Sequence, residues 1–425
     1  MHWTEKLSFF ALALSLMVIP LDSGTSYVFT CLWIFSIVLK NTLLKRWSFF
    51  GWHQDKSYNY GKSAYLLIPM MAYFCLYLLS MIWTANKAVG WGEVWRLAWF
   101  VAIPLTCACT DFREVTKTHL RNILWLYVLF MSVLFLVVWA IVIMKDHGVA
   151  ILSFLDFLTG STFYYIHHSY MAVYILAGLA FLYSECVSSE KPSAGKIVMI
   201  VLCACCLFLF LLFINSRTGS LGLGMLLLMC LSHLCFVRKK YRASVIALVT
   251  VLLLGCVVHF MLPDKYKRLL VTTEQVTQGD TSDVRFIIME NAWTVVKENP
   301  VLGVGVGDIK DSLIPFYGDL ESVFRPHNQY LETWMATGVF GVVALLLMMF
   351  LPLYSAFRSR RWLVVSIIII FAVSNLFESM LERQMGVSFF CVMMAMFVIG
   401  STQLHSQLFN EREELVVLPI MDKVV

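Results

Sequence analysis

The sequence predicts an all-α polytopic membrane protein with about 12 transmembrane helices and one large, partly helical loop on its outer side. The first observation behind this prediction is the composition. Of 425 residues, 60% are hydrophobic and 14% are charged, and the mean hydropathy is +0.78. A soluble domain has too little interior to bury so much apolar surface, so lipid must cover part of it.

The second observation is that apolar stretches of near-spanning length recur along the chain. They lie near residues 7–21, 25–43, 64–83, 90–109, 120–144, 165–184, 197–214, 219–237, 243–262, 331–357, 362–377 and 385–400. Several approach the short limit for a spanning helix, so one or two of them could be re-entrant. The first stretch predicts a retained helix rather than a signal peptide, because its polar flank, Leu21–Thr25, lacks the small-x-small cleavage pattern.

The third observation is that basic residues concentrate in alternate short loops. These residues are Lys40, Lys45, Arg46, Lys56, Lys62, Arg113, Lys117, Arg121, Lys191, Lys196, Arg238, Lys239, Lys240, Arg242, Arg358, Arg360 and Arg361. Loops rich in Lys and Arg face the cytoplasm, so these loops and both termini are predicted to lie inside. The long loop 263–330 then lies outside. The inside-facing residues account for most of the net charge of +5, which therefore does not indicate nucleic acid as a partner.

The predicted organisation has four consecutive segments. Helices one to nine occupy residues 1–262, the external loop occupies 263–330, helices ten to twelve occupy 331–400, and a cytoplasmic tail follows over 401–425. None of the twelve cysteines lies in the external loop, so we expect free thiols packed as small hydrophobic side chains rather than disulfides.

Three outer-face elements carry candidate functional residues, and the first is the turn Asn215–Ser220 between helices seven and eight. The turn is too short to carry Arg217 far from the lipid headgroups. A guanidinium at that depth can donate two hydrogen bonds to one phosphate. The alternative is a snorkelling interface anchor, which is the commoner role of a lone boundary arginine.

The second element is an amphipathic helix predicted over residues 281–297, with Ile288, Ala292 and Val295 on its buried face. Arg285 lies in its first turn, where a cation opposes the helix dipole, so an anionic partner explains it better than helix stability does. A salt bridge to Asp280, Asp283 or Glu290 is an equal alternative. The glycines of 303–307 do not match a nucleotide-binding spacing, and they predict a flexible backbone that folds this loop against the membrane.

The third element begins at His327, at the boundary between the external loop and helix ten. Neutral imidazole can remove a proton from a hydroxyl near neutral pH, so His327 is a candidate general base. Arg325 and Asn328 flank it, Glu332 could orient it, and the small residues Gly338 and Gly341 on the following helix predict close helix packing. The alternative is an ordinary interfacial histidine.

Weaker candidates lie elsewhere on the predicted outer face. His167 and His168 enter helix six beside several tyrosines, and Arg268 follows helix nine together with Lys265 and Lys267. Arg96 is a candidate anion contact near the outer end of helix four, although Glu93 lies three residues before it and the two could simply pair.

Three features together resemble the O-antigen ligase and polymerase superfamily. They are the Ser216–Gly219 turn, the Arg285 helix with Pro300 and the glycines after it, and the His327–Asn328 run. The last run matches the ligase motif: histidine, then Asn, Ser or Gln, nine residues, glycine, two residues, and Gly, Thr or Tyr. Gly338 and Gly341 occupy the motif's final positions. The resemblance extends to the helix layout and the single large external loop.

The resemblance implies glycosyl transfer at the periplasmic face of a Gram-negative inner membrane. The donor is an undecaprenyl-diphosphate-linked glycan, and in a ligase the acceptor is a sugar hydroxyl of lipid A-core. His327 then carries the base role, and Arg217 and Arg285 bind the diphosphate. No nucleotide cofactor is needed, because the lipid diphosphate is already activated. We expect no metal either, because the outer loop has no Asp-x-Asp pair or His/Cys ligand cluster.

Three other functions stay open on the sequence. An O-antigen polymerase would use a second lipid-linked glycan as acceptor, and a protein O-oligosaccharyltransferase would use Ser or Thr of an exported protein. A transporter or flippase of lipid-linked glycans would also have about twelve helices, but it would place functional charges near the bilayer midplane. The candidate residues here gather at the outer face instead, which favours an enzyme.

Overall fold

The structure is a computed structural model, and it describes the chain in segments. The described residues are 3–21, 23–45, 47, 65–110, 112, 115–146, 168–188, 192–214, 216–242, 244–246, 248–249, 284–316 and 325–417. The predicted helix at 243–262 lies mostly outside these residues, and so does much of the external loop.

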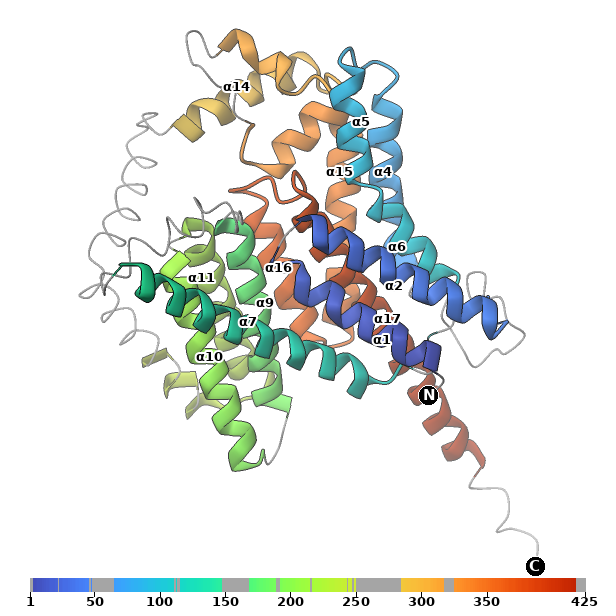
Figure 1. Cartoon of the computed structure of the whole chain (residues 1–425), viewed down its shortest axis with the longest axis vertical. Helices are drawn as coiled ribbons and strands as arrows, with labels where there is room; N and C mark the ends of the chain where they lie inside the picture. The colour runs from blue at the N-terminus through green and yellow to red at the C-terminus, as the bar shows by residue number, and fades with distance from the viewer. Residues whose placement is uncertain are drawn as a thin grey trace, which may run out of the picture.

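Within the described segments the fold is all-helical, which confirms the all-α part of the predicted fold class (Figure 1). The α-helices are α1 (Trp3–Val18), α2 (Ser23–Leu43), α4 (Ile68–Ser80), α5 (Lys87–Arg96), α6 (Trp99–Ala108), α7 (Lys117–Asp146), α9 (His168–Ser188), α10 (Ala194–Ile214), α11 (Arg217–Ser232), α14 (Val284–Glu298), α15 (Gln329–Arg358), α16 (Trp362–Ser374) and α17 (Gln384–Val417). Short helical turns η1 (Tyr65–Leu67), η2 (His233–Val237) and η3 (Asp311–Phe316) accompany them.

In the part of the chain that the structure describes, seven helical segments are long and apolar enough to cross a membrane, so the chain is a multi-pass membrane protein. They begin at Gly24, Lys117, His168, Ala194, Arg217, Gln329 and Gln384. The segments Tyr65–Ser80 and Trp362–Ser374 are apolar but shorter. The predicted helix at 90–109 is two helices of 10 residues each, because the chain turns at Leu97 and Ala98 between α5 and α6. A total of twelve spans stays a prediction.

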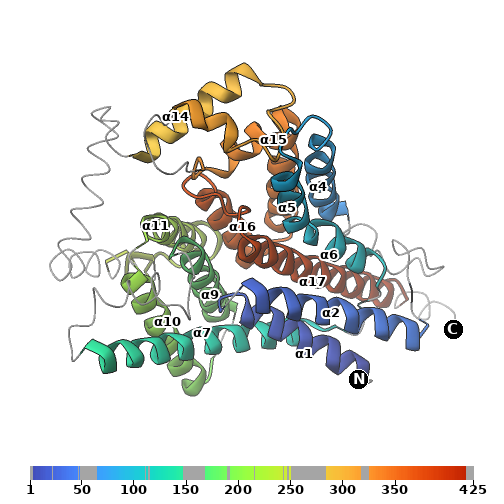
Figure 2. The ribbon, with the colours of Figure 1, turned by 45° about the horizontal axis from the view of Figure 1, so that its top comes forward.

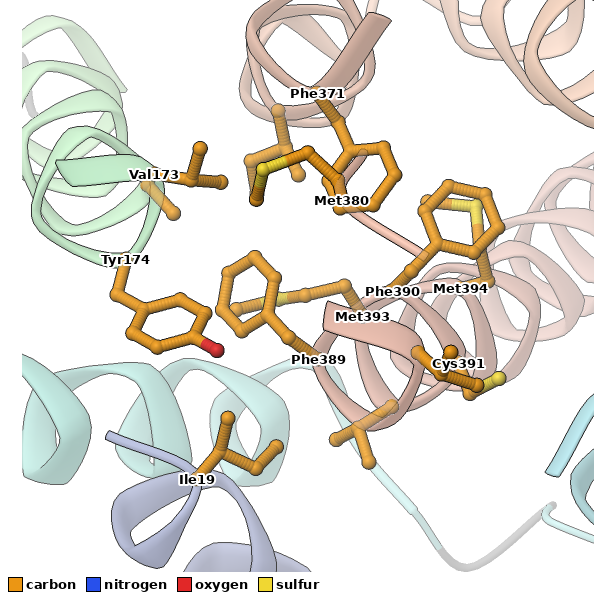
Figure 3. Close-up of a cluster of buried hydrophobic side chains, with 14 of the residues drawn as sticks. Ile19, Val173, Tyr174, Phe371, Met380, Phe389, Phe390, Cys391, Met393 and Met394 are labelled. Carbon is orange, nitrogen blue, oxygen red and sulfur yellow. The ribbon is translucent and has the colours of Figure 1, made fainter. Parts of the chain in front are cut away.

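The helix α17 lies at the centre of the fold. Within its candidate span, 83% of the residues are buried by other parts of the protein. Figure 3 shows Phe389 of α17 beside Tyr174 of α9, and Phe390 of α17 beside Phe371 of α16. The Phe389 ring centroid is 4.7 Å from that of Tyr174, and the Phe390 centroid is 4.8 Å from that of Phe371. Such close packing makes α17 a support for the polar loop that precedes it.

The predicted outer-face loops meet at one end of the helices. Asp308 of the external loop accepts hydrogen bonds from the backbone nitrogens of Ala85 and Asn86, at 2.6 and 2.7 Å, in the turn between α4 and α5. The loop between α16 and α17 contacts the start of α15, where Asn375 O accepts a bond of 2.8 Å from Gln329 N. Loops far apart in the sequence therefore build one polar surface.

Basic residues predicted to face the cytoplasm meet at another end. The carboxylate of Glu185, near the end of α9, lies 2.8 Å from a guanidinium nitrogen of Arg121 and 3.0 Å from Lys196 Nζ. Arg238 donates to Val187 O of the same helix. Figure 2 shows how α7, α9 and α10 come together here. The polar loops near Ser169 and the basic residues near Glu185 thus lie at opposite ends of α9. The compartment that each end faces stays a prediction.

The amphipathic helix predicted at 281–297 is confirmed as α14. Its residues Ile288, Ala292 and Val295 are 2%, 0% and 3% exposed, as expected of one apolar face at helical spacing. Residues 281–283, which the prediction included at the start of this helix, lie outside the described part of the chain. Below α14, the loop that begins at Pro300 lies against α15 (Figure 1).

The contact between this loop and α15 depends on Gly338. Its φ of 66° and ψ of −161° interrupt the helix, so α15 has a break rather than a continuous axis. A Cβ on Gly338 would lie 1.9 Å from Val301 O, and one on Gly303 would lie 2.4 Å from Met335 O. The expectation that Gly338 serves packing between helices is therefore wrong, because the close approach is to the backbone of the loop.

Replacing Gly338 with alanine is expected to destabilise the protein. The left-handed backbone alone costs about 1–3 kcal/mol for a residue with a side chain, and the new methyl group would displace Val301. The measurement is the apparent Tm of the purified protein at a fixed heating rate. Gly224→Ala in α11 is the control, because its Cβ would meet nothing within 4 Å. Equal Tm values for Gly338→Ala and wild type would contradict this account of the break.

Candidate functional site

The side chain of His327 pairs with that of Glu378. The distance between His327 Nδ1 and Glu378 Oε1 is 3.0 Å. Glu378 is 3% exposed, while the His327 side chain is 25% exposed. Glu378 Oε2 also accepts a hydrogen bond of 3.2 Å from Ser169 Oγ of α9. A buried carboxylate thus fixes the orientation of a partly accessible imidazole.

The backbone at His327 adopts a left-handed conformation with φ of 49°, which residues other than glycine rarely adopt. Asn328 follows as the N-cap of α15, and its side-chain oxygen accepts from the backbone nitrogens of Tyr330 and Leu331 at 2.9 and 3.1 Å. Asparagine satisfies otherwise unpaired N–H groups at a helix start. The His-Asn pair of the motif therefore marks a sharp entry of the chain into α15.

The loop that carries Glu378 is held against the start of α15 by several hydrogen bonds. Asn328 Nδ2 donates to Leu376 O at 3.1 Å, and Leu381 N donates to Gln329 Oε1 at 2.7 Å. On the side of α9, Tyr170 Oη donates to Ser379 O at 2.8 Å. These contacts lie on both sides of Glu378 in the sequence, so they hold its side chain in place beside His327.

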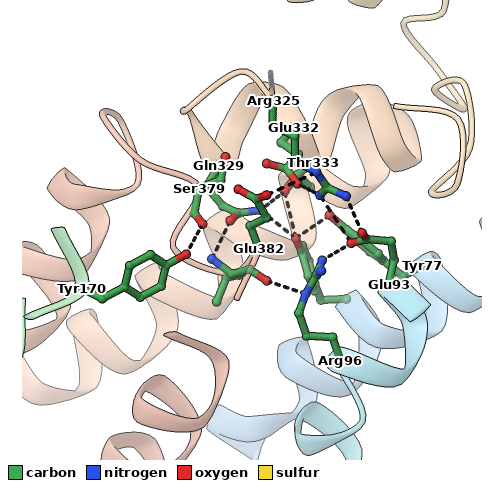
Figure 4. Close-up of polar contacts among 12 residues, drawn as sticks. Tyr77, Glu93, Arg96, Tyr170, Arg325, Gln329, Glu332, Thr333, Ser379 and Glu382 are labelled. Atoms are coloured by element: carbon green, nitrogen blue, oxygen red, sulfur yellow. Dashed lines mark hydrogen bonds and ion pairs between the residues drawn. The ribbon is translucent and has the colours of Figure 1, made fainter. Parts of the chain in front are cut away.

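Arg325 lies two residues before His327 and contacts three glutamates (Figure 4). Its guanidinium forms ion pairs with Glu93 of α5 and Glu332 of α15, and its Nε lies 3.4 Å from Glu382 Oε1. Arg325 is 8% exposed. One buried cation therefore joins α5, α15 and the loop between α16 and α17.

The charges of this cluster shift two pKa values outside the membrane-spanning helices. Burial alone would lower the pKa of Arg325, but Glu332, Glu93 and Glu382 outweigh it and raise the pKa. Burial raises the pKa of the Glu382 carboxyl, and the charge of Glu332 raises it further. Arg325 is thus firmly held in its charged form by its neighbours.

The expectation that Glu332 orients His327 is not supported by the geometry. Glu332 forms its ion pair with Arg325, and the carboxylate beside the imidazole is that of Glu378. Sequence reasoning did not select Glu378. Its position in the sequence could have indicated it. Glu378 lies in the short predicted outer loop before helix twelve, and no Asp or Glu occurs in the preceding residues 333–377.

The structure confirms that Arg96 pairs with Glu93 at the end of α5. Arg96 Nε also donates to Leu381 O at 3.2 Å, in the loop that carries Glu378. Figure 4 shows Arg96 on the other side of Glu93 from Arg325. Arg96 thus belongs to the network that positions the loop.

Arg217 is exposed and is the first residue of α11. Ser216 caps this helix through its side-chain oxygen, which accepts from Gly219 N at 3.1 Å. A Cβ on Gly219 would lie 2.8 Å from Ala172 of α9, and one on Gly222 would lie 2.5 Å from Leu176. These two contacts mean that α9 and α11 run parallel, so Arg217 lies at the same end as the Ser169–Glu378 bond.

The other predicted site residues are described only in part. Arg285 lies in the first turn of α14, but its side chain is outside the described part of the structure, as are His167 and Arg268. His168 begins α9 and is half-buried, one residue before Ser169. Among the described residues, no three His, Cys, Asp or Glu side chains are grouped as ligands for a metal.

This arrangement fits a base-assisted reaction of a hydroxyl group. In the tautomer in which His327 Nδ1–H donates its hydrogen bond to Glu378 Oε1, the lone pair on Nε2 is available to take up a proton. The dipole of α11 also favours negative charge at its N-terminus, where Arg217 lies.

Comparisons with known proteins find similarity over parts of the chain. An uncharacterized protein of Haemophilus influenzae is 27% identical over 154 residues, which cover 33% of this chain. The match spans only 38% of the relative's own length. Residues 201–346, which contain Arg217, Arg285 and His327, match the family model described as O-Antigen ligase. This match, over residues 201–346, supports the assignment of the chain to the O-antigen ligase superfamily.

Proposed function

We propose that this protein is an O-antigen ligase, which transfers a glycan from undecaprenyl diphosphate to a sugar hydroxyl of lipid A-core. The reaction takes place at the periplasmic face of the inner membrane. The pairing of His327 with the buried Glu378 is the observation that carries this proposal. His327 lies in the segment that matches the family model, and Glu378 lies outside that segment but contacts it through His327.

In the proposed reaction, the acceptor hydroxyl attacks the anomeric carbon of the lipid-linked glycan. A new C–O bond forms there, and the bond to the diphosphate breaks with its electron pair leaving on the diphosphate oxygen. His327 Nε2 takes up the hydroxyl proton, and Glu378 stabilises the imidazolium that results. The proposed transferase needs no metal, because guanidinium groups stabilise the charge on the leaving diphosphate.

Arg217 and Arg285 are the proposed diphosphate ligands. Support for Arg217 comes from its place at the N-terminus of α11, at the same end as His327. Arg285 lies on the first turn of α14. The polyprenyl tail of the donor would remain in the bilayer while its diphosphate reaches these residues at the headgroup level.

Arg217→Gln is expected to lower kcat/KM for the lipid donor about 100-fold or more, since it removes a charged donor to the leaving group. Arg217→Lys should lower it about tenfold, because lysine keeps the charge but loses the two-pronged geometry. The rate of glycan transfer at varied donor concentration measures both effects. Lys240→Gln is the control at the opposite end of the helices. Wild-type kcat/KM in Arg217→Gln would assign Arg217 to membrane anchoring instead.

Glu378→Gln is expected to lower kcat about 10–10⁴-fold, because the carboxylate orients the imidazole and stabilises its charged form. The KM for the donor should change little, because Glu378 does not contact the diphosphate in this proposal. Ser169→Ala is the matched variant, since it removes only the bond to Glu378 Oε2 and should have a smaller effect. An unchanged kcat in Glu378→Gln would show that the pair has no part in catalysis.

The test of the function is a transfer assay with purified protein, undecaprenyl-diphosphate-linked glycan and lipid A-core, in the presence of EDTA. Glycosylated lipid A-core together with released lipid diphosphate supports the ligase. Polymer formed on a second lipid-linked glycan would indicate a polymerase, and product on an exported protein would indicate a protein O-oligosaccharyltransferase. Movement of the donor across liposomes without a new glycosidic bond would indicate a flippase. Activity that requires a divalent ion would overturn the metal-free reaction.

A further inference from the structure

The end of α14 and the loop after it carry exposed apolar side chains. Trp293 is 41% exposed, Val301 is 54% exposed and Leu302 is 53% exposed. The opposite face of α14 is buried against the rest of the protein. Apolar side chains that cluster on a surface usually mark a contact with lipid or with another molecule.

This apolar surface continues into the outward face of α15. Val339 N donates a hydrogen bond of 3.1 Å to Pro300 O, which brings Val301 beside Val339. Exposed apolar residues then follow down α15 at helical spacing: Val339, Phe340, Val343, Leu346, Leu347 and Phe350. Because α15 is a candidate membrane span, this stripe is the surface that the helix presents to acyl chains.

The break at Gly338 gives the depth of the surface. α15 has 30 residues, and Gly338 is its tenth, so 20 residues lie beyond the break. A straight helix of that length extends about 30 Å, the thickness of the bilayer hydrocarbon. Where these 20 residues cross the hydrocarbon, Val301 and Leu302, whose backbone touches Gly338, lie at the boundary between hydrocarbon and headgroups.

The residues above this boundary are of the types that favour headgroups. The ring centroids of Trp293 and Trp334 are 5.6 Å apart at an interplanar angle of 82°. Trp334 Nε1 donates to Pro300 O at 2.9 Å, and Lys297 Nζ lies 6.0 Å from the centroid of the Trp293 ring. Tryptophan with a neighbouring lysine is typical of the interface between bilayer and water.

We propose that Trp293, Val301, Leu302 and Trp334 form a membrane-contact surface that rests on phospholipids of the leaflet at the His327 end. Leu302 and Val301 enter the upper acyl region, and the two tryptophans lie among the headgroups. Contact with lipid sets the height of α14 above the bilayer, and with it the height of Arg285 in the first turn. The contact is a property of the fold, so it stands or falls independently of the proposed transfer reaction.

The test uses the full-length protein in nanodiscs of phosphatidylethanolamine and phosphatidylglycerol that also contain a small share of undecaprenyl phosphate. A photoreactive benzophenone amino acid replaces Trp293 or Leu302, one position at a time. Phe350, on the lipid-facing stripe of α15, is the positive control position. Glu298, which is exposed on another side of α14, is the negative control position. Mass spectrometry after illumination identifies the adducts.

We expect phospholipid adducts at Leu302, Trp293 and Phe350, with at least tenfold fewer at Glu298. Adducts at Phe350 without any at Leu302 or Trp293 would place the surface in water and overturn the proposal. Adducts formed mainly with undecaprenyl phosphate would overturn it in favour of a path for the donor lipid. A cross-link to a second copy of the chain would overturn it in favour of a protein interface.

Discussion

Replacing His327 with asparagine is expected to lower the rate of glycan transfer by about 10²–10⁴-fold, the usual contribution of a positioned general base. Asparagine is the informative choice because it tolerates the left-handed backbone, with φ of 49°, that His327 adopts. Alanine at this position would add backbone strain to the loss of the base. The measurement is single-turnover transfer from the lipid-linked donor to lipid A-core at saturating donor.

Two controls separate catalysis from folding in this experiment. The apparent Tm of His327→Asn should stay close to that of wild type, and binding of the lipid-linked donor should persist, because the arginines proposed to hold the diphosphate are unchanged. His119→Asn, at the start of α7 where the ring contacts Phe9, should transfer glycan at the wild-type rate. Transfer by His327→Asn at the wild-type rate would remove the base assignment and leave the imidazole a structural role beside Glu378.

Local patterns in the sequence were sufficient to predict several parts of this site. The apolar spacing of Ile288, Ala292 and Val295 correctly predicted the buried face of α14, because helical periodicity depends on neighbouring residues alone. The three-residue spacing of Glu93 and Arg96 gave an ion pair between them as one of two alternatives, and the structure contains that ion pair. The change from polar loop to apolar helix at His327 predicted where α15 begins.

The features that the sequence did not predict depend on contacts between distant segments. Glu378 lies 51 residues after His327, and nothing in its local sequence shows that hydrogen bonds from Asn328 and Gln329 hold its loop against α15. Glu332 was the nearer acid in the sequence, but Arg325 engages it. The break at Gly338 could not be predicted from the sequence either, because it depends on the close approach of the Val301 backbone from a distant loop.

Replacing Arg325 with glutamine is expected to lower the free energy of unfolding by about 3–5 kcal/mol, because it leaves buried carboxylates without their cation. Glu93 keeps its ion pair with Arg96, but Glu332 loses the ion pair it forms with Arg325. The change should also displace His327, which lies two residues away, and so lower transfer. The apparent Tm and the transfer rate measure the two effects.

A second substitution tests whether charge is the cause. In Arg325→Gln/Glu332→Gln the unpaired carboxylate becomes a neutral amide, so a large part of the lost Tm should return. Removing the charge of Glu332 also relieves its effect on Glu382, whose pKa it raises. Arg358→Gln, an exposed arginine at the other end of α15, should change the free energy of unfolding by no more than about 0.5 kcal/mol. If the double variant is no more stable than Arg325→Gln, the cluster stabilises the site by packing of the arginine side chain and not by its charge.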